Sequence, residues 1–181
     1  MGDAQPVSLV IAGPIGAGKS TVSSILADSY GFEHLSYVNL IWKPILASRG
    51  VVANRRELQK LGAELMREHG SAGLAKLILP FIPNGDFVID DIRSPAVLDA
   101  LRTEISGLKL AFIVVGDELR RRRATERDNV SIHDQLAAEA FSTESEIYQL
   151  ASLADYTVEN NGDIPELRGR LTEIVEELRY A

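Results

Sequence analysis

The chain has 181 residues, which suits one compact domain with a substantial core and is short for two. Hydrophobic residues make up 45% and charged residues 25%, so disorder and fibrous repeats are not expected. A formal net charge of -7 argues against bulk attraction to nucleic acid or to an anionic membrane, although a local basic patch can still bind phosphate. The absence of cysteine excludes disulfides, thiolate catalysis and cysteine-based zinc sites.

Neither the first residues nor the apolar runs lead us to expect a secretion signal or a membrane span. The first six residues are polar and lack the basic-then-apolar order of a secretion signal. The longest apolar runs are far shorter than the ~20 residues that a bilayer span needs. We therefore expect a cytoplasmic protein with one domain over residues 1–181 and no membrane partner, present as a monomer or a homodimer.

Strand-like and helix-like segments alternate along the whole chain. Three expected strands are short, largely apolar runs, at Val7–Ala12, Phe87–Ile92 and Leu110–Val115, and two further strands are expected at Phe32–Ser36 and Tyr156–Glu159. Helical periodicity is seen at Lys19–Ser29, and further helices are expected to begin near Asn54, Ser94, Asp117 and Asp163. This alternation predicts an α/β fold whose parallel sheet has helices on both faces, with ligands at the carboxyl ends of the strands.

The strongest motif lies between the first expected strand and the first expected helix. It fits the pattern G-x-x-x-x-G-K-[ST] and consists of Gly13, Pro14, Ile15, Gly16, Ala17, Gly18, Lys19, Ser20 and Thr21. Glycines let successive N–H groups turn around a phosphate, and the following helix adds its positive amino end. Lys19 can reach the β- and γ-phosphates, and the Ser20 hydroxyl can bind Mg²⁺.

Two other interpretations of this loop are weaker. A glycine-rich turn that merely joins strand to helix would match the pattern only rarely by chance. A dinucleotide-binding turn requires G-x-G-x-x-G, and here Gly16-Ala17-Gly18 is followed by Lys19-Ser20-Thr21. The sequence therefore predicts a site for ATP and Mg²⁺.

A second cluster, Asp90-Asp91-Ile92-Arg93, closes the third expected strand. A carboxylate there can hold Mg²⁺, with Asp90 the predicted ligand, or orient an attacking hydroxyl, and Arg93 can clamp an acceptor phosphate. The structural alternative is that Asp91 caps the helix near Ser94 and that Arg93 is its solvated partner.

Arginines dominate the start of the helix after the fourth expected strand. Arg120, Arg123 and Arg127 share one helical face and can offset the charge of a transferring phosphoryl group. The alternative is a charged face that solvent covers. We expect a small lid over residues 120–134 that can close over the substrates.

Two smaller signals complete the predicted site. Asn160, Asn161 and Gly162 follow the last expected strand, where an Asn-Gly turn is most often only a turn but can also offer backbone groups to a nucleobase. His34 lies beside a strand end and is a minor candidate for a substrate contact.

Together these motifs resemble the nucleoside monophosphate kinase-like branch of the P-loop kinases. That branch includes adenylate kinases, phage-type deoxynucleoside monophosphate kinases, dephospho-coenzyme A kinases and small archaeal relatives. The segment from Asn54 to Gly62 is similar to one in the deoxynucleotide kinases and in the archaeal group. The resemblance implies a three-layer P-loop NTP hydrolase fold with a central five-stranded parallel sheet, and transfer of a phosphoryl group from ATP.

The resemblance also implies roles for individual residues. The phosphate loop would hold ATP, the arginines would form the lid, Asn161 and Gly162 would lie at the adenine, and Arg55 and Gln59 would lie on the acceptor side. Many relatives carry an acidic and a basic residue after the second strand, whereas this chain has Asn39 and Lys43. Asn39 cannot act as a base, so the predicted catalytic carboxylate is Asp90 or Asp91.

The sequence thus predicts a kinase of a small nucleotide-like acceptor, most readily a (deoxy)nucleoside monophosphate. The predicted catalytic residues are Lys19, Asp90, Asp91, Arg93, Arg120, Arg123 and Arg127, and the predicted acceptor residues are Asn39, Lys43, Arg55, Gln59 and Arg93. The alternatives are a dephospho-coenzyme A kinase, a phage-type kinase of a hydroxymethylated base in DNA, and an ATP-hydrolysing switch. The net acidity weighs against nucleic acid as a partner without ruling it out.

Overall fold

A computed structural model describes residues 6–128 and 142–180. Its five-stranded sheet has the order β2-β3-β1-β4-β5, and every neighbouring pair is parallel. The strands are β1 (Ser8–Ala12), β2 (Glu33–Ser36), β3 (Phe87–Asp90), β4 (Lys109–Val114) and β5 (Tyr156–Glu159). The predicted α/β fold is confirmed, and the expected strands differ from the observed ones only at their ends.

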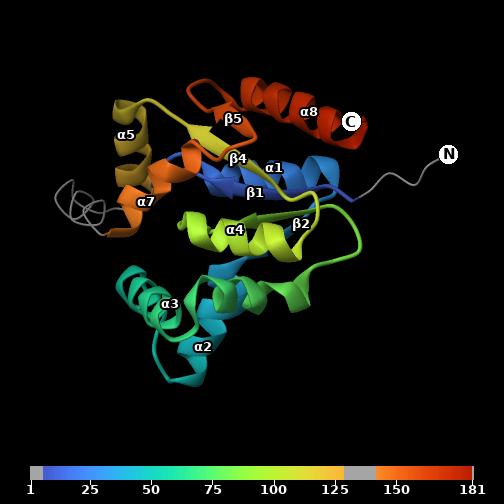
Figure 1. The fold of residues 1–181 in the computed structure, drawn as a ribbon. Helices are drawn as coiled ribbons and strands as arrows, with labels where there is room; N and C mark the ends of the chain where they lie inside the picture. The colour runs from blue at the N-terminus through green and yellow to red at the C-terminus, as the bar shows by residue number, and fades with distance from the viewer. Residues whose placement is uncertain (1–5, 129–141, 181) are drawn as a thin grey trace.

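Helices connect the strands and cover both faces of the sheet (Figure 1). The helices that follow a strand directly or through a short loop are α1 (Lys19–Tyr30), α4 (Pro95–Glu104), α5 (Asp117–Asp128) and α8 (Ile164–Tyr180), and α7 (Ser142–Ala151) precedes β5. No helix in the described ranges is both long and apolar enough to cross a bilayer.

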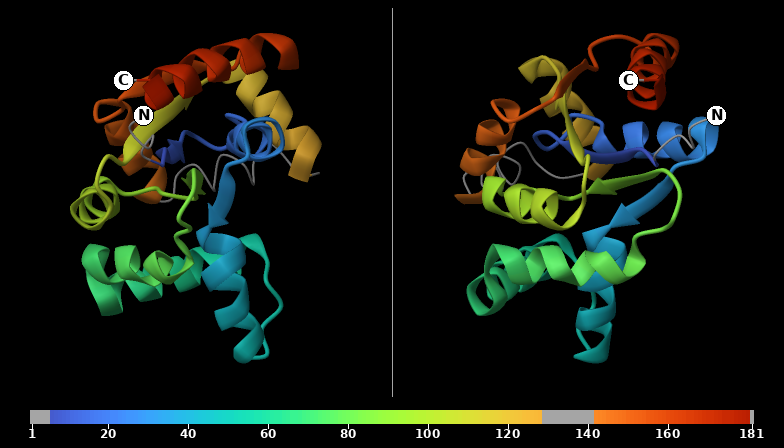
Figure 2. Two further views of the ribbon diagram at one scale, coloured as in Figure 1. Left: turned by 90° about the vertical axis from the view of Figure 1, so that its right-hand side faces the viewer. Right: turned by 45° about the vertical axis from the view of Figure 1, so that its right-hand side comes forward.

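The connection between β2 and β3 is much longer than the others. It contains a π-helical turn η1 (Val38–Trp42), α2 (Lys43–Ser48), α3 (Arg55–Ile78) and a 3₁₀ turn η2 (Leu79–Phe81). These helices form a lobe below the sheet, from which α2 projects (Figures 1 and 2). The sequence predicts only the start of α3, where Asn54 accepts a hydrogen bond from the Glu57 N–H at 3.0 Å.

Two apolar cores fill the space between sheet and helices, because alternate strand residues point to opposite faces. On one face Leu9, Ile11 and Val88 pack with α1 and α8. On the other face Val10 and Ile89 pack with α3, α4 and α7. This alternation explains the nearly continuous apolar runs, since every position of a strand covered on both faces is buried.

Two expected helix caps differ from the structure. The Ser94 hydroxyl makes no capping hydrogen bond, although α4 does begin at Pro95. Asp117 is the first residue of α5, and its carboxylate pairs with Arg120 at 3.4 Å. The cap of α8 is confirmed, since Asp163 accepts a hydrogen bond from the Glu166 N–H at 2.9 Å.

Candidate active site

The phosphate loop runs from the end of β1 to the first turn of α1 at the carboxyl edge of the sheet. Gly18 has a φ of 96°, and a Cβ there would collide with the side-chain amide of Asn160. Gly13 has a φ of 154°, and a Cβ there would lie 2.9 Å from the Ile113 carbonyl oxygen. The glycines that the motif demands are therefore required both by backbone conformation and by close packing.

Lys19 and Ser20 occupy the first turn of α1. The Lys19 ammonium donates to the carbonyls of Gly13 at 2.6 Å and Pro14 at 3.0 Å, so it lies across the loop. Ser20 is exposed, as a hydroxyl that binds a ligand must be. Both residues lie where the positive end of the helix attracts a phosphate.

The arginines of α5 contact the phosphate loop and the turn after β5. Arg120 is 4% exposed and donates to the Ile15 carbonyl at 3.3 Å, which contradicts the interpretation of this residue as part of a solvated face. Arg123 donates to the Asn160 carbonyl at 2.8 Å. Arg127 lies in the last turn of α5, but its side chain is not among those that the structure describes. Residues 129–134 of the expected lid also lie outside the described residues.

The turn after β5 closes the other side of the loop. The buried Asn160 amide donates to the Ala17 carbonyl at 2.8 Å, and the Asn161 side chain accepts from the Gly116 N–H at 2.7 Å. The sequence prediction named the turn Asn160-Asn161-Gly162 and assigned Asn161 and Gly162 to the adenine, but it did not predict that the Asn160 side chain makes the direct contact with the phosphate loop. Its position directly after a strand was the available signal.

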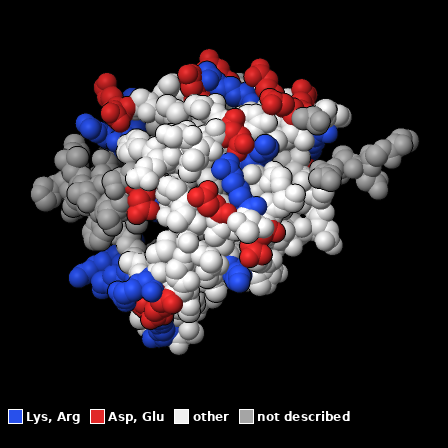
Figure 3. All heavy atoms as spheres, viewed as in Figure 1, with Lys and Arg blue, Asp and Glu red and all other residues white. Residues whose placement is uncertain are grey.

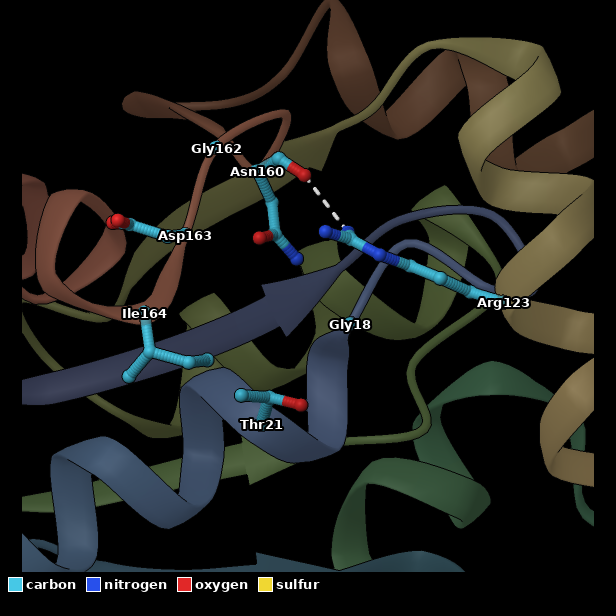
Figure 4. A pocket seen from close by; sticks show the side chains of 7 residues that line it. All are labelled: Gly18, Thr21, Arg123, Asn160, Gly162, Asp163 and Ile164. Atoms are coloured by element: carbon cyan, nitrogen blue, oxygen red, sulfur yellow. Dashed lines mark hydrogen bonds between the residues drawn. The ribbon is translucent and has the colours of Figure 1, made fainter.

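A cavity of about 310 Å³ opens between this turn and the start of α1. In Figure 4, Arg123 extends from α5 toward Asn160, while Thr21 lies below and Asp163 and Ile164 lie to one side. Gly18 and Gly162 complete the lining. Of the residues predicted for ATP, Gly18, Thr21 and Gly162 therefore share one cavity.

A compact polar cluster lies at the carboxyl ends of β2 and β3. His34 Nε2 lies 2.6 Å from Oδ2 of Asp90, which is 6% exposed. Oδ2 of Asp91 accepts from the Ser36 hydroxyl at 2.7 Å and from the Val38 N–H at 3.3 Å. Asp91 has a φ of 69°, a conformation that is rare outside glycine. Asp91 thus binds the end of β2, so the alternative in which it caps the helix near Ser94 is wrong.

The two adjacent carboxyl groups perturb titration in this cluster. Burial, reinforced by the neighbouring Asp90 carboxylate, raises the pKa of Asp91 to about 6. The hydrogen bond to Asp90 raises the pKa of His34 above its ordinary value, against the opposing effect of burial. From the sequence alone, His34 is only a minor candidate, because its pairing with Asp90 depends on β2 and β3 being neighbours in the sheet.

The residues predicted for the acceptor lie mainly in the lobe between β2 and β3. The Lys43 ammonium donates to the Asn39 side chain at 2.8 Å. Arg55 and Gln59, one turn apart at the start of α3, are both half-buried. Arg93 is half-buried in the connection from β3 to α4, at the carboxyl end of the sheet. Figure 3 shows basic side chains gathered over the α3 lobe, interspersed with acidic ones.

Asp90 is a residue that could contribute one ligand to a magnesium ion. Oδ1 of Asp90 is buried, and no described residue provides it with a hydrogen-bond partner. Asp90 follows Val88 by two positions and so lies on the sheet face that α1 covers, the helix whose first turn carries Ser20. A carboxylate and a hydroxyl are the oxygen donors that Mg²⁺ accepts alongside phosphates and water.

Sequence comparison gives the class of protein. Residues 12–134 match a family described as an AAA domain, and the chain belongs to this family. It is 37% identical to a cytidylate kinase of Geobacter sulfurreducens over 120 residues, 62% of this chain and 46% of that protein. It is 28% identical to a UPF0200 protein of Pyrobaculum aerophilum over 94% of this chain and 98% of the relative. The chain thus spans about half the length of the cytidylate kinase and nearly all of the archaeal protein.

Solved structures agree on the fold. A Thermus thermophilus protein, TT1252, superposes with a TM-score of 0.64 at 20% identity, covering 96% of this chain and 98% of that one. A shikimate kinase of Bacteroides thetaiotaomicron gives 0.58 at 19% identity, covering 94% and 98%. The protein has the P-loop kinase fold, and its sequence is similar to that of proteins named cytidylate kinase and adenylate kinase.

Proposed function

We propose that the protein is an ATP- and Mg²⁺-dependent kinase that transfers the γ-phosphoryl group to a small nucleotide-like acceptor, most readily a (deoxy)nucleoside monophosphate. The observation that carries this proposal is the convergence on one phosphate loop of Lys19, the α5 arginines and the turn after β5. Each of these groups has a defined task in phosphoryl transfer.

The triphosphate would lie in the loop, with backbone N–H groups and the Lys19 ammonium around the β- and γ-phosphates. Arg120 and Arg123 already reach the loop and the adjoining turn, so their charge is in place to offset that of the transferring group. Mg²⁺, when bound, would neutralise phosphate charge, and Ser20 and Asp90 are the residues that would hold it.

The base of the nucleotide would occupy the cavity beside Gly18, with the planar guanidinium of Arg123 against it. The acceptor would enter from the α2–α3 lobe, where Asn39, Lys43, Arg55 and Gln59 lie, and Arg93 at the sheet edge would bind its phosphate. A nucleoside monophosphate suits this arrangement because its phosphate oxygen is already a nucleophile and needs no strong base.

The test is a transfer assay with γ-labelled ATP against a panel of acceptors. The panel holds ribo- and deoxyribonucleoside monophosphates, dephospho-coenzyme A, shikimate, hydroxymethylated DNA and a no-acceptor control. The proposal predicts label in a nucleoside diphosphate. Transfer of label to dephospho-coenzyme A, shikimate or DNA would show that the acceptor belongs to that class instead. ATP hydrolysis that no acceptor stimulates would favour an ATP-hydrolysing switch protein over a kinase.

A further inference from the structure

The side chains of His34 and Asp90 form a close contact that has no role in the phosphoryl transfer proposed above. His34 lies on β2 and Asp90 ends β3, and the parallel register pairs Ser36 with Asp90 and His34 with Val88. The 2.6 Å contact joins side chains that are 30% and 8% exposed. A hydrogen bond to a carboxylate this well shielded is stronger than a neutral one at the surface. Because Oδ2 is an acceptor, Nε2 must carry the hydrogen.

This contact fixes the orientation of the Asp90 carboxylate. A carboxylate can rotate about its Cβ–Cγ bond, and the bond from His34 holds Oδ2 toward β2. The other oxygen, Oδ1, is buried without a hydrogen-bond partner among the described residues. An acceptor left in this state costs about 1–3 kcal/mol unless a ligand pairs with it.

The neighbouring carboxyl group has a different task. Asp91 accepts hydrogen bonds from the Ser36 hydroxyl and the Val38 N–H, and both reach its Oδ2. Asp91 is thereby tied to the segment that leads from β2 into η1. Asp90, in contrast, lies on the face of the sheet that packs against α1, where the phosphate loop ends.

We propose that His34 is a positioning residue for phosphoryl transfer: it holds Oδ2 of Asp90 so that Oδ1 faces the hydrated metal ion of the bound nucleotide. This inference rests on the proposed function for the presence of Mg²⁺ and ATP. It differs from a purely structural role, in which the pair would only fasten β2 to β3. Partners that orient a metal ligand typically change metal affinity by about 10- to 100-fold when they are removed.

The experiment compares three substitutions with the wild-type protein. His34→Leu removes the donor, and His34→Gln keeps an N–H group near the position of Nε2. His69→Leu is the matched control, because His69 is exposed on α3 and its imidazole lies 3.9 Å from the carboxylate of Glu68. Mn²⁺ replaces Mg²⁺ so that electron paramagnetic resonance can measure its affinity for the protein–ATP complex without any acceptor.

We expect His34→Leu to weaken Mn²⁺ binding to the ATP complex by about 10-fold or more, while metal-free ATP binds as before. His34→Gln and His69→Leu should stay within about threefold of wild type. In the transfer assay, His34→Leu should lower kcat with little change in KM for the acceptor. Rescue by the glutamine distinguishes orientation of Asp90 from simple packing.

Two results would overturn the inference. One is unchanged Mn²⁺ affinity in His34→Leu, and the other is equal loss of affinity in His34→Leu and His34→Gln together with equal loss of thermal stability. If His34→Leu does not fold, His34→Asn replaces it, because its amide is too short to reach Oδ2. If the wild-type protein binds Mn²⁺ and ATP but phosphorylates no acceptor, the proposed function is refuted. The role of His34 is then decided by the Mn²⁺ affinities of the variants alone.

Discussion

The Asn160 side chain joins the turn after β5 to the phosphate loop. Replacing it with alanine should lower both the stability of the fold and the affinity for the nucleotide. In Asn160→Ala the buried Ala17 carbonyl loses its 2.8 Å hydrogen bond from Nδ2. An unsatisfied buried carbonyl costs about 1–3 kcal/mol. At roughly 2–4 °C per kcal/mol for a chain of this size, the midpoint of that range lowers Tm by about 4–8 °C.

The measurement is thermal and urea unfolding of the variant with and without ATP and Mg²⁺. Asn161→Ala is the matched control, because Asn161 is exposed and water can replace its bond to the Gly116 N–H. We expect this control to change stability by no more than about 0.5 kcal/mol. Equal Tm values for the two variants would refute the reasoning, as would an Asn160→Ala variant that ATP stabilises as strongly as it does the wild type.

Three further predictions concern other contacts. Gly18→Ala should weaken ATP binding and lower stability together, because its φ of 96° and the nearby Asn160 amide both oppose a side chain; isothermal titration and thermal unfolding measure the two effects, and normal ATP affinity would contradict this reasoning. Arg179→Met should lower the free energy of unfolding by about 1–2 kcal/mol in urea titrations, since it breaks the 2.6 Å ion pair with Asp86; an unchanged midpoint would show that this pair contributes nothing. Because the pKa of Asp91 is raised from 3.8 to about 6, its protonated form favours the folded state, so the stability that this group contributes should be full below about pH 4 and be lost as pH rises through about 6. Asp91→Asn should flatten this decline and leave the variant more stable than wild type at pH 7, and a wild-type slope in the variant would assign the decline to another group.

Part of the structure follows from local sequence. The run Val7–Ala12 is apolar at every position except Ser8, because a strand covered on both faces has no solvent side, and β1 is observed there. The phosphate loop can also be predicted from local sequence. A backbone that wraps around a phosphate requires its glycines, and Lys19 and Ser20 supply the ammonium and hydroxyl groups for the ligand.

Other parts depend on contacts between distant segments. Asn160 and Ala17 are 143 positions apart, and nothing local tells which asparagine of the Asn160–Asn161 pair turns inward. His34 and Asp90 meet only because β2 lies beside β3 in the sheet. The burial of Arg120 against the phosphate loop likewise depends on how α5 packs, which its run of arginines does not specify.

Transfer of the γ-phosphoryl group by the wild-type protein and by Lys19→Ala tests the central claim most directly. Labelled ATP, Mg²⁺ and the best acceptor of the panel would be used, with circular dichroism to establish that both proteins are folded. Removal of the ammonium that lies across the phosphate loop should reduce transfer by about 100-fold or more with the fold intact. Transfer at the wild-type rate by folded Lys19→Ala would contradict the assignment of this loop as the site of phosphoryl transfer.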